Sequence, residues 1–324
     1  MRMKSLFQIV FLGVLTHVMA LPSLFSQDKE MGYYFEGDEV VFEFDPRVYA
    51  KATIDGTADK LDFSDLDIYK VVVTGNFNKW SKKGWKMKQV GDYKYQLRKK
   101  ITDFDDRFTW EFKFLVNNKY WAEPDPAKHN TNKIFQNIFL EEVYNLKLHT
   151  IQASKEGKVR FFLKGYPTAE KVILAGTFNA WDEEFLHMDK VEEGWELRAD
   201  LPAGYYEYKF IVDGEWMHDP VNPKKKVNEH QTFNSVLEVV KTVTFKLADF
   251  QEAEKVILAG SFNDWNEDDL RMRKEGDHWI LHIDMNAGKH WYKFIVDGKW
   301  MIDPQNPLQE HDRDGYVNSV LIVN

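Results

Sequence analysis

A tryptophan and a lysine are predicted to lie side by side on the outer face of a β-hairpin. The turn of this hairpin is Asp213-Gly214, because Asp and Gly tolerate the positive φ angles that a two-residue turn requires. With these residues at the turn, Trp216 faces Ile211, and Lys209 lies on the same side of the sheet. The other side is filled by Tyr208, Phe210, Val212 and Met217. Trp216 is therefore predicted to contact a ligand or a partner, and the alternative is that it belongs to the core.

This hairpin and the turn before it recur 84 residues later in the chain. KVILAGTFNAW begins at Lys171 and KVILAGSFNDW at Lys255, while YKFIVDGEWMHDP at Tyr208 is matched by YKFIVDGKWMIDP at Tyr292. A period of this length indicates a repeated domain rather than a solenoid turn. A more divergent copy lies upstream, where VVVTGNFNKW begins at residue 71 and FKFLVNNKYWAEP at residue 112. The chain therefore contains three copies of one unit.

Each copy has the sequence pattern of short β-strands. Apolar or alternating runs are separated by Gly, Pro, Asn and Asp, and no segment carries a convincing helical stripe. About seven strands in roughly 85 residues is the size of an immunoglobulin-like sandwich. Alternation with Leu197 and Leu281 also predicts that Trp195 and Trp279 are core residues. The fold is therefore predicted to be all-β, with three tandem immunoglobulin-like (early-set) β-sandwich domains.

The repeats divide the chain into a series of parts. These are a signal peptide (1–26), a divergent β-sandwich (27–145), a linker (146–157) and two further β-sandwiches (158–240 and 241–324). Ser154 and Gly157 favour a loose linker between the first two sandwiches. A strand ending at Val240 runs almost directly into one that begins at Val243, so the second and third sandwiches are expected to be held rigidly.

The N-terminal residues predict export. Arg2 and Lys4 precede an uncharged apolar run from Leu6 to Val18, as in a secretory signal peptide. No later segment approaches the roughly 20 apolar residues of a membrane-spanning helix. We therefore expect a periplasmic or extracellular protein that is not inserted in a membrane. The net charge of −9 argues against nucleic acid as a partner, and the lack of cysteine leaves each domain dependent on its own core.

At these motifs the chain resembles family 48 of the carbohydrate-binding modules, which includes the glycogen-binding module of the AMP-activated protein kinase β subunit. The shared pattern is Gly-x-Phe-Asn-x-Trp, then Tyr-Lys-Phe-x-Val-Asp-Gly-x-Trp-x-x-Asp-Pro, then an Asn that opens the last strand. It covers nearly all of the second and third copies. The resemblance implies that the sugar-binding residues are Trp181, Lys209, Trp216 and Asn234 in the second copy and Trp265, Lys293, Trp300 and Asn318 in the third. It also implies an α-glucan ligand, such as glycogen or starch-type maltooligosaccharide, and no cofactor.

These residue types suit recognition of a sugar. A glucose ring has apolar C–H faces and a polar rim, so an exposed Trp can cover the face while Lys and Asn donate hydrogen bonds to the hydroxyls. In the family, the loop before the final Asn carries a Leu that inserts at the sugar. His230 and Asp314 stand at that place in the second and third copies, so the loop is expected to differ in shape.

The first copy departs from the pattern. Trp80 and Lys113 match, but an alignment without gaps places Tyr120 at the second Trp and Gln136 near the Asn. Trp121 is then predicted to face Phe114 and to point into the core. The weaker candidates for sugar binding are therefore Trp80, Lys113, Tyr120 and Gln136. We expect the first copy to contribute least to binding, and the alternative is that it is a degenerate copy with a structural role only.

No catalytic or metal-binding residue is predicted. Glycoside hydrolysis normally requires two positioned carboxylates, usually in a separate domain, and the acidic runs near Asp62 to Asp67 and Asp312 to Asp314 lack full calcium-loop spacing. The sequence therefore predicts a non-catalytic α-glucan-binding protein, with glucan-processing enzymes or envelope proteins as further candidate partners. The alternative is an envelope scaffold, in which the same sandwiches bind proteins and no sugar.

Overall fold

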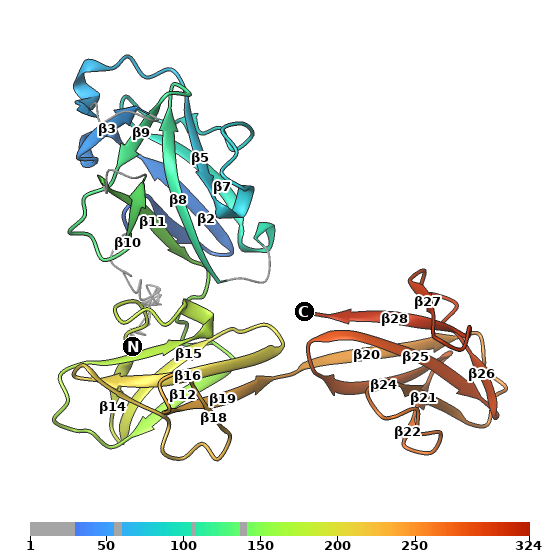
Figure 1. The fold of residues 1–324 in the computed structure, drawn as a ribbon. Coiled ribbons are helices and arrows are strands. Elements are labelled where there is room, and N and C mark those ends of the chain that lie inside the picture. Colours follow the sequence, from blue (N-terminus) through green and yellow to red (C-terminus); the bar gives the residue numbers. More distant parts are fainter. Residues whose placement is uncertain (1–29, 55–59, 105–107, 137–140) are drawn as a thin grey trace, which may run out of the picture.

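The computed structural model describes residues 30–54, 60–104, 108–136 and 141–324. The predicted signal peptide lies outside these residues. The described chain forms antiparallel sheets that are joined by turns and short 3-10 helices, and it is arranged in three units (Figure 1). The prediction of an all-β fold of tandem β-sandwiches is confirmed. Among the described residues, we find no helix with the length and apolar character needed to cross a membrane.

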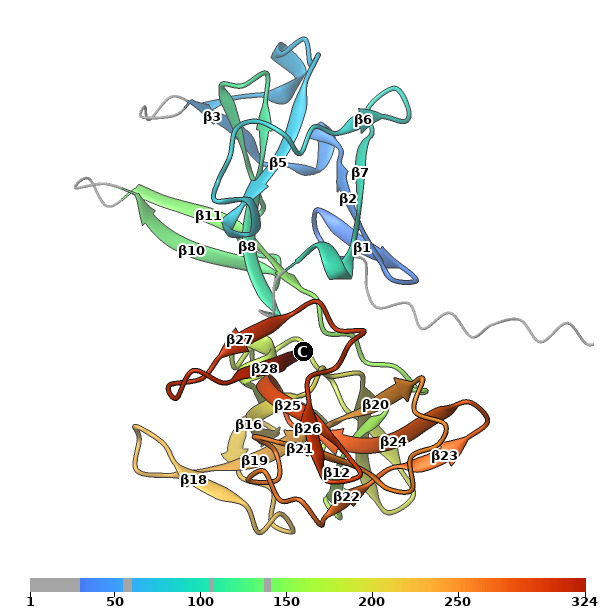
Figure 2. The same ribbon diagram turned by 90° about the vertical axis from the view of Figure 1, so that its right-hand side faces the viewer.

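The first unit consists of a four-stranded and a seven-stranded sheet. The smaller sheet has the order β1-β2-β7-β6, from Tyr33–Glu36, Glu39–Phe44, Tyr95–Lys100 and Lys88–Gln89. The larger sheet has the order β10-β11-β8-β9-β3-β4, from Thr131–Gln136, Glu141–His149, Thr109–Val116, Tyr120–Glu123, Lys51–Ile54 and Lys60–Leu61, and β5 (Val71–Gly75) also pairs with β8. Figure 2 shows β10 and β11 as a long hairpin beside β8. The 3-10 helices are η1 (Pro46–Val48), η2 (Phe63–Asp65), η3 (Asn76–Asn78) and η4 (Ile101–Asp103).

The second unit has a three-stranded and a five-stranded sheet. The first has the order β12-β15-β14, from Val159–Lys164, Gly194–Ala199 and Asp189–Val191. The second has the order β13-β16-β19-β18, from Val172–Gly176, Gly204–Val212, Phe233–Val239 and Lys225–Val227, and β17 (Glu215–Met217) also pairs with β16. The 3-10 helix η5 (Thr177–Asn179) follows β13.

The third unit repeats this arrangement. Its three-stranded sheet has the order β20-β24-β23, from Lys241–Ala248, His278–Met285 and Arg273–Glu275. Its larger sheet has the order β22-β21-β25-β28-β27, from Leu270–Arg271, Val256–Gly260, Gly288–Val296, Val317–Val323 and Gln309–His311, and β26 (Lys299–Met301) pairs with β25.

Each unit has its own apolar core between its two sheets. Phe112 and Phe114 lie at the centre of the first core, Phe178 and Phe210 in the second, and Phe294 in the third. Trp195 and Trp279 are each 5% exposed, as strand alternation predicted. Burial of these side chains stabilises each sandwich by about 25 cal/mol per Å² of apolar surface removed from water.

A polar triad accounts for the Tyr and Asp of the repeated motif. The Tyr208 hydroxyl donates to Asp219 Oδ2 (2.7 Å), and the Asp219 N–H donates to Ser235 Oγ (2.7 Å). Tyr292, Asp303 and Ser319 repeat these bonds in the third unit. In the first unit the corresponding places are taken by Phe112, Pro124 and Leu146, all buried. Because all three groups become apolar together, no buried polar atom of the triad is left without a partner.

The connection between the first and second units is more ordered than a loose linker. β11 extends to His149, past residue 146 where the linker is expected to begin, and Ile151 is buried in the second core. The Ser154 N–H donates to the Arg198 carbonyl oxygen (2.8 Å). A Cβ on Gly157 would lie 2.5 Å from the Ala199 nitrogen, so this glycine permits close packing on β15.

The second and third units are joined by one residue, Val240, which separates β19 from β20. Ala203 of the second unit also packs against the third core. A connection this short leaves the two units little freedom to reorient.

Candidate functional site

The loop after β13 holds Trp181 in a defined place. Asn179 Oδ1 accepts a hydrogen bond from the Gly176 N–H (2.8 Å), and the Trp181 N–H donates to the Gly176 carbonyl oxygen (2.9 Å). Ala180 and Trp181 both adopt the left-handed conformation, with φ of 52° and 61°. The pattern recurs at Asp264 and Trp265, with φ of 50° and 57°. The Gly-x-Phe-Asn-x-Trp motif therefore encodes a tight turn that presents an indole.

Trp181 and Trp216 of the second unit form a pair on the outer face of the larger sheet. Trp181 packs against Ile173, Ala175 and Ile211, which form a small cluster on the side away from the main core. Trp216 lies opposite Ile211 in the hairpin and is 39% exposed, as strand parity predicted. The two ring centroids are 6.2 Å apart, with the planes inclined by 46°. An apolar, angled platform results.

The third unit builds the same platform. Trp265 packs against Ile257, Ala259 and Ile295, and Trp300 is 41% exposed opposite Ile295. The ring centroids are 6.1 Å apart and the planes are inclined by 48°. Two units thus hold the same pair of rings in nearly the same geometry.

Polar groups flank the platform of the second unit. Lys209 Nζ donates to Thr232 Oγ1 (2.8 Å), and burial lowers the pKa of Lys209. The Asn234 amide donates to Glu207 Oε2 (2.8 Å) and accepts from the Asn228 amide (2.9 Å). Asn234 is thereby fixed in orientation, and its amide is largely committed to bonds within the protein.

The third unit differs at this polar edge. Lys293 Nζ lies 5.6 Å from the centroid of the Tyr316 ring, which takes the place of Thr232. Tyr316 is 66% exposed and adds a third aromatic ring beside the platform. Asn318 donates to Asp312 Oδ2 (3.1 Å). The third face is therefore richer in aromatic surface than the second.

The loops that carry His230 and Asp314 are shaped by one preceding side chain. Asn228 Oδ1 accepts from the backbone N–H groups of His230 and Thr232, both at 3.0 Å. Asp312 Oδ1 accepts from the N–H of Asp314 at 3.0 Å in the third unit. Both loops are held by these bonds, with a polar residue where the family pattern has a Leu.

The expectation that Tyr120 replaces the second tryptophan is wrong. Trp121 pairs with Leu115, and Tyr120 pairs with Val116 and packs against the first core. The reason is the turn, which has three residues from Asn117 to Lys119 and not two. The extra residue shifts the return strand, so that Trp121 occupies the place of Trp216 and does not face Phe114.

Gln136 is likewise not the counterpart of Asn234. It lies at the end of β10 opposite Glu141, and its side chain lies outside the described residues. The counterpart is Asn145, whose amide donates to Glu111 Oε2 (2.7 Å), as Asn234 donates to Glu207. The strand register agrees, because Leu146 pairs with Phe112 as Ser235 pairs with Tyr208. A sequence alignment that allowed for the longer turn and the longer last hairpin of the first unit would have identified Trp121 and Asn145.

The first unit nevertheless presents its face differently. Trp80 follows the same left-handed turn, with φ of 56° at both Lys79 and Trp80. Lys113 is buried, and its Nζ lies 2.7 and 2.8 Å from the two carboxylate oxygens of Glu123. Burial lowers the pKa of Lys113, while the Glu123 charge opposes this effect. Lys82 Nζ lies 5.5 Å from the Trp121 ring centroid. The ammonium group of Lys113 is thus already paired with the Glu123 carboxylate.

These faces suit a ligand built of rings that have apolar faces and a polar rim. The indoles offer apolar surface, and the neighbouring lysine offers N–H donors. The model of the family described as the glycogen recognition site of AMP-activated protein kinase matches residues 161–246 and again 242–324. The chain therefore belongs to this family.

Individual relatives match one unit at a time. The AMP-activated protein kinase subunit beta-1 of Homo sapiens is 37% identical over 73 residues, which are 22% of this chain and 26% of that protein. Protein PTST homolog 2, a chloroplastic protein of Arabidopsis thaliana, is 37% identical over 71 residues, or 22% of this chain and 13% of that protein. A pullulanase from Bacillus acidopullulyticus aligns with 91% of this chain and 37% of its own, at 13% identity and a TM-score of 0.21. The chain thus spans only about a quarter or less of the length of the two sequence relatives, and 37% of the length of the pullulanase.

Proposed function

We propose that this protein binds α-glucan chains of the glycogen or starch type and does not transform them. The observation that carries the proposal is the pair of inclined indoles, repeated in two units at 6.2 and 6.1 Å. Membership of the glycogen-recognition family supports the same ligand class. We assign the contacts to Trp181, Lys209, Trp216 and Asn234 and to Trp265, Lys293, Trp300 and Asn318.

The geometry fits a curved sugar chain better than a flat one. Each indole covers the apolar C–H face of one glucose ring, and an inclination of 46° between Trp181 and Trp216 follows the bend between successive α-1,4-linked rings. Lys209 lies beside the rings as a donor to hydroxyls. Asn234 acts mainly by fixing the strand edge, because its amide already bonds to Glu207 and Asn228.

Tandem linkage is the proposed source of affinity for a polymer. A shallow sugar site binds weakly alone, because few atoms are desolvated and flexible hydroxyls must be ordered. Linking two sites makes the second contact intramolecular, which raises apparent affinity by roughly 10² to 10⁴ when one polymer reaches both. Because Val240 alone connects β19 to β20, we expect the second and third faces to have little freedom to reorient relative to each other.

We further propose that the protein acts outside the cytoplasm as a binding protein that presents or retains glucan. The basis is the charged and apolar pattern of the N-terminal residues, which lie outside the described structure. Enzymes that process glucan in the same compartment are proposed partners. The competing proposal is a scaffold whose tryptophan faces bind envelope proteins.

The test is native affinity electrophoresis of the mature protein in gels that contain glycogen, soluble starch, cellulose or xylan. We expect retardation by glycogen and starch only. Equal mobility in every gel would contradict the sugar-binding proposal and favour the scaffold. The non-catalytic part is tested separately, since reducing sugar released from starch by pure protein, and abolished by one carboxylate substitution, would refute it.

A further inference from the structure

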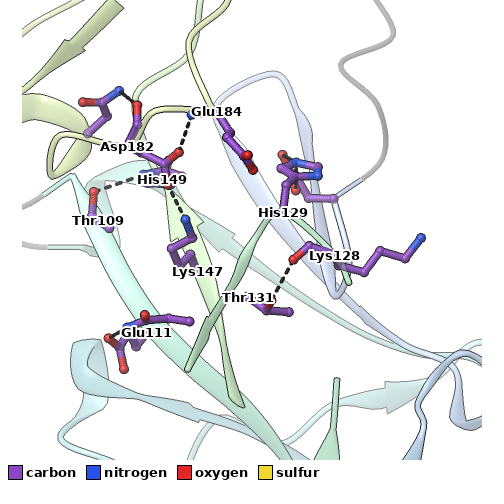
Figure 3. A network of polar contacts seen from close by, with 12 residues as sticks. Thr109, Glu111, Lys128, His129, Thr131, Lys147, His149, Asp182 and Glu184 are labelled. Atoms are coloured by element: carbon purple, nitrogen blue, oxygen red, sulfur yellow. Dashed lines mark hydrogen bonds and ion pairs between the residues drawn. The ribbon is translucent and has the colours of Figure 1, made fainter. Parts of the chain in front are cut away.

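The first and second units meet at the loop that holds Trp181. β11 of the first unit carries Lys147 and His149 on one face, because they are two residues apart on a strand. Both side chains contact the carboxylate of Asp182, the residue directly after Trp181. Lys147 Nζ forms an ion pair with Asp182 Oδ2, and His149 Nε2 lies 3.4 Å from the same oxygen (Figure 3).

This junction is buried and closely packed. The side chains of His149 and Asp182 are only 2% and 9% exposed. The His149 ring stacks on Phe185, with centroids 4.1 Å apart and planes inclined by 28°, and its Nδ1 lies 3.1 Å from Thr109 Oγ1. Burial alone would raise the pKa of the Asp182 carboxyl, but hydrogen bonds with His149 and Lys147 outweigh burial and hold this pKa below its usual value. Asp182 is therefore ionised and held in place.

Asp182 is also part of the turn that orients the indole. Its Oδ1 accepts from the Glu184 N–H (2.9 Å), and its carbonyl oxygen accepts from the Asn179 amide (3.4 Å). Asn179 is the residue whose Oδ1 bonds to Gly176 at the start of the same turn. The contact with the first unit is thus one residue from Trp181 and within one hydrogen-bonded loop.

The third unit provides an internal comparison. Asn266 stands in place of Asp182, and Asp269 in place of Phe185. Asn266 Oδ1 still accepts from the Asp268 N–H (2.9 Å), and the Asn266 carbonyl oxygen still accepts from the Asn263 amide (3.3 Å). The turn therefore needs neither the carboxylate nor the phenyl ring. The Asp182 carboxylate and the Phe185 ring occur in the second unit, where both contact side chains of the first unit.

We propose that Lys147 and His149 of the first unit are positioning residues for the Trp181 site of the second unit. The inference rests on the proposed glucan-binding function and adds to it a dependence of one site on the neighbouring unit. A loop that is held before binding loses less entropy when the ligand arrives, so its affinity is higher. The second site is held from outside its own unit, whereas in the described residues the corresponding turn of the third unit is held by bonds of its own Asn263 and Asn266.

The experiment measures maltoheptaose binding by calorimetry in two full-length backgrounds. Trp121→Ala with Trp300→Ala leaves the second site, and Trp121→Ala with Trp216→Ala leaves the third. Asp182→Asn keeps the turn and removes the charge. We expect it to weaken binding about fivefold at the second site and to leave the third unchanged.

Matched variants separate positioning from general destabilisation. Lys147→Ala is expected to weaken maltoheptaose binding at the second site as much as Asp182→Asn does, and the double variant to bind no more weakly than either single variant. Lys147→Arg keeps the positive charge and is expected to bind as the parent does. Asn266→Asp introduces a carboxylate without the docked unit and is expected to leave the third site unchanged. Unchanged affinity of the second site after both Asp182→Asn and Lys147→Ala, or equal losses at both sites, would overturn the proposal alone. If neither of the two background proteins bound maltoheptaose before Asp182 or Lys147 was changed, the proposed function would be overturned as well.

Discussion

Trp121 lies opposite Leu115 in the first unit, as Trp216 lies opposite Ile211 in the second. The relationship gives the first unit a tryptophan at the ligand face, where the sequence alignment without gaps had placed a tyrosine. Tyr120 packs against the core. Adjacent aromatic residues therefore have separate roles, one in the proposed site and one in stability.

This separation predicts opposite effects for two alanine substitutions. Trp121→Ala should leave the unfolding midpoint nearly unchanged and remove whatever maltoheptaose binding remains in a Trp216→Ala/Trp300→Ala protein. Tyr120→Ala should lower the free energy of unfolding of the first unit by about 1–3 kcal/mol, because it removes a partly buried ring from the core. Calorimetric titration and thermal unfolding measure the two effects. A larger loss of stability with Trp121→Ala than with Tyr120→Ala would reverse the assignment.

The tryptophans of the second and third units should dominate retention by glycogen. Trp216→Ala and Trp300→Ala each remove an indole that covers a sugar face, which costs on the order of 1–2 kcal/mol, or about tenfold in affinity. Together they should nearly abolish retardation in a glycogen gel. Tyr69→Ala, which removes a ring that is 71% exposed elsewhere, is the control and should have no effect. The ranking of the units fails if Trp80→Ala weakens retention more than either tryptophan change.

The glycine before the Trp80 turn should tolerate no side chain. A Cβ on Gly75 would lie 2.3 Å from the Glu111 carbonyl oxygen on β8, so Gly75→Ala forces the two strands apart. We expect a loss of about 2 kcal/mol or more in unfolding free energy of the first unit. Gly91→Ala is the matched control, since its Cβ would lie 4.0 Å from the nearest atom, in Lys94. Similar midpoints for both variants in urea would contradict this account.

Acid should weaken the junction between the first two units. The folded-state pKa of Asp182 lies below the usual value of about 3.9, because His149 and Lys147 bond to its carboxylate. As the pH falls, the unfolded chain therefore takes up this proton first. The stabilisation is fully present above about pH 5 and is lost as the pH falls through the folded-state pKa.

The prediction is that Asp182→Asn destabilises the protein at pH 7 and that the difference from the parent narrows by pH 3. Urea unfolding monitored by tryptophan fluorescence at both pH values measures it. A constant difference between parent and Asp182→Asn would mean that the carboxylate is not the stabilising species.

Sequence patterns predicted the second and third units well because each signal there is local. Asp213-Gly214 sets a two-residue turn, so strand parity placed Trp216 outside and Phe210 in the core. In the first unit, the prediction of the site residues was wrong where the spacing between them changed. One extra residue after Asn117 moved Trp121 to the outer face, and the longer last hairpin moved the amide position from Gln136 to Asn145.

The contact of Lys147 and His149 with Asp182 could not be predicted in this way. It depends on how two folded units meet, and the charged residues involved resemble ordinary surface residues in the sequence. Gly157 illustrates the same limit, since it suggests a flexible linker but instead allows the chain to pack closely on Ala199.

The extra strands of the first unit draw attention to the edges of the larger sheets. In the described residues β3 and β4 continue the sheet beyond β9, whereas β17 and β26 each pair on one side only. An exposed strand edge is a template for pairing with another chain, and very short edge strands reduce that hazard. β17 and β26 are three residues long and each carries a charged residue, Glu215 or Lys299. The strands that present Trp216 and Trp300 to a ligand are thus too short to nucleate a cross-β stack between molecules.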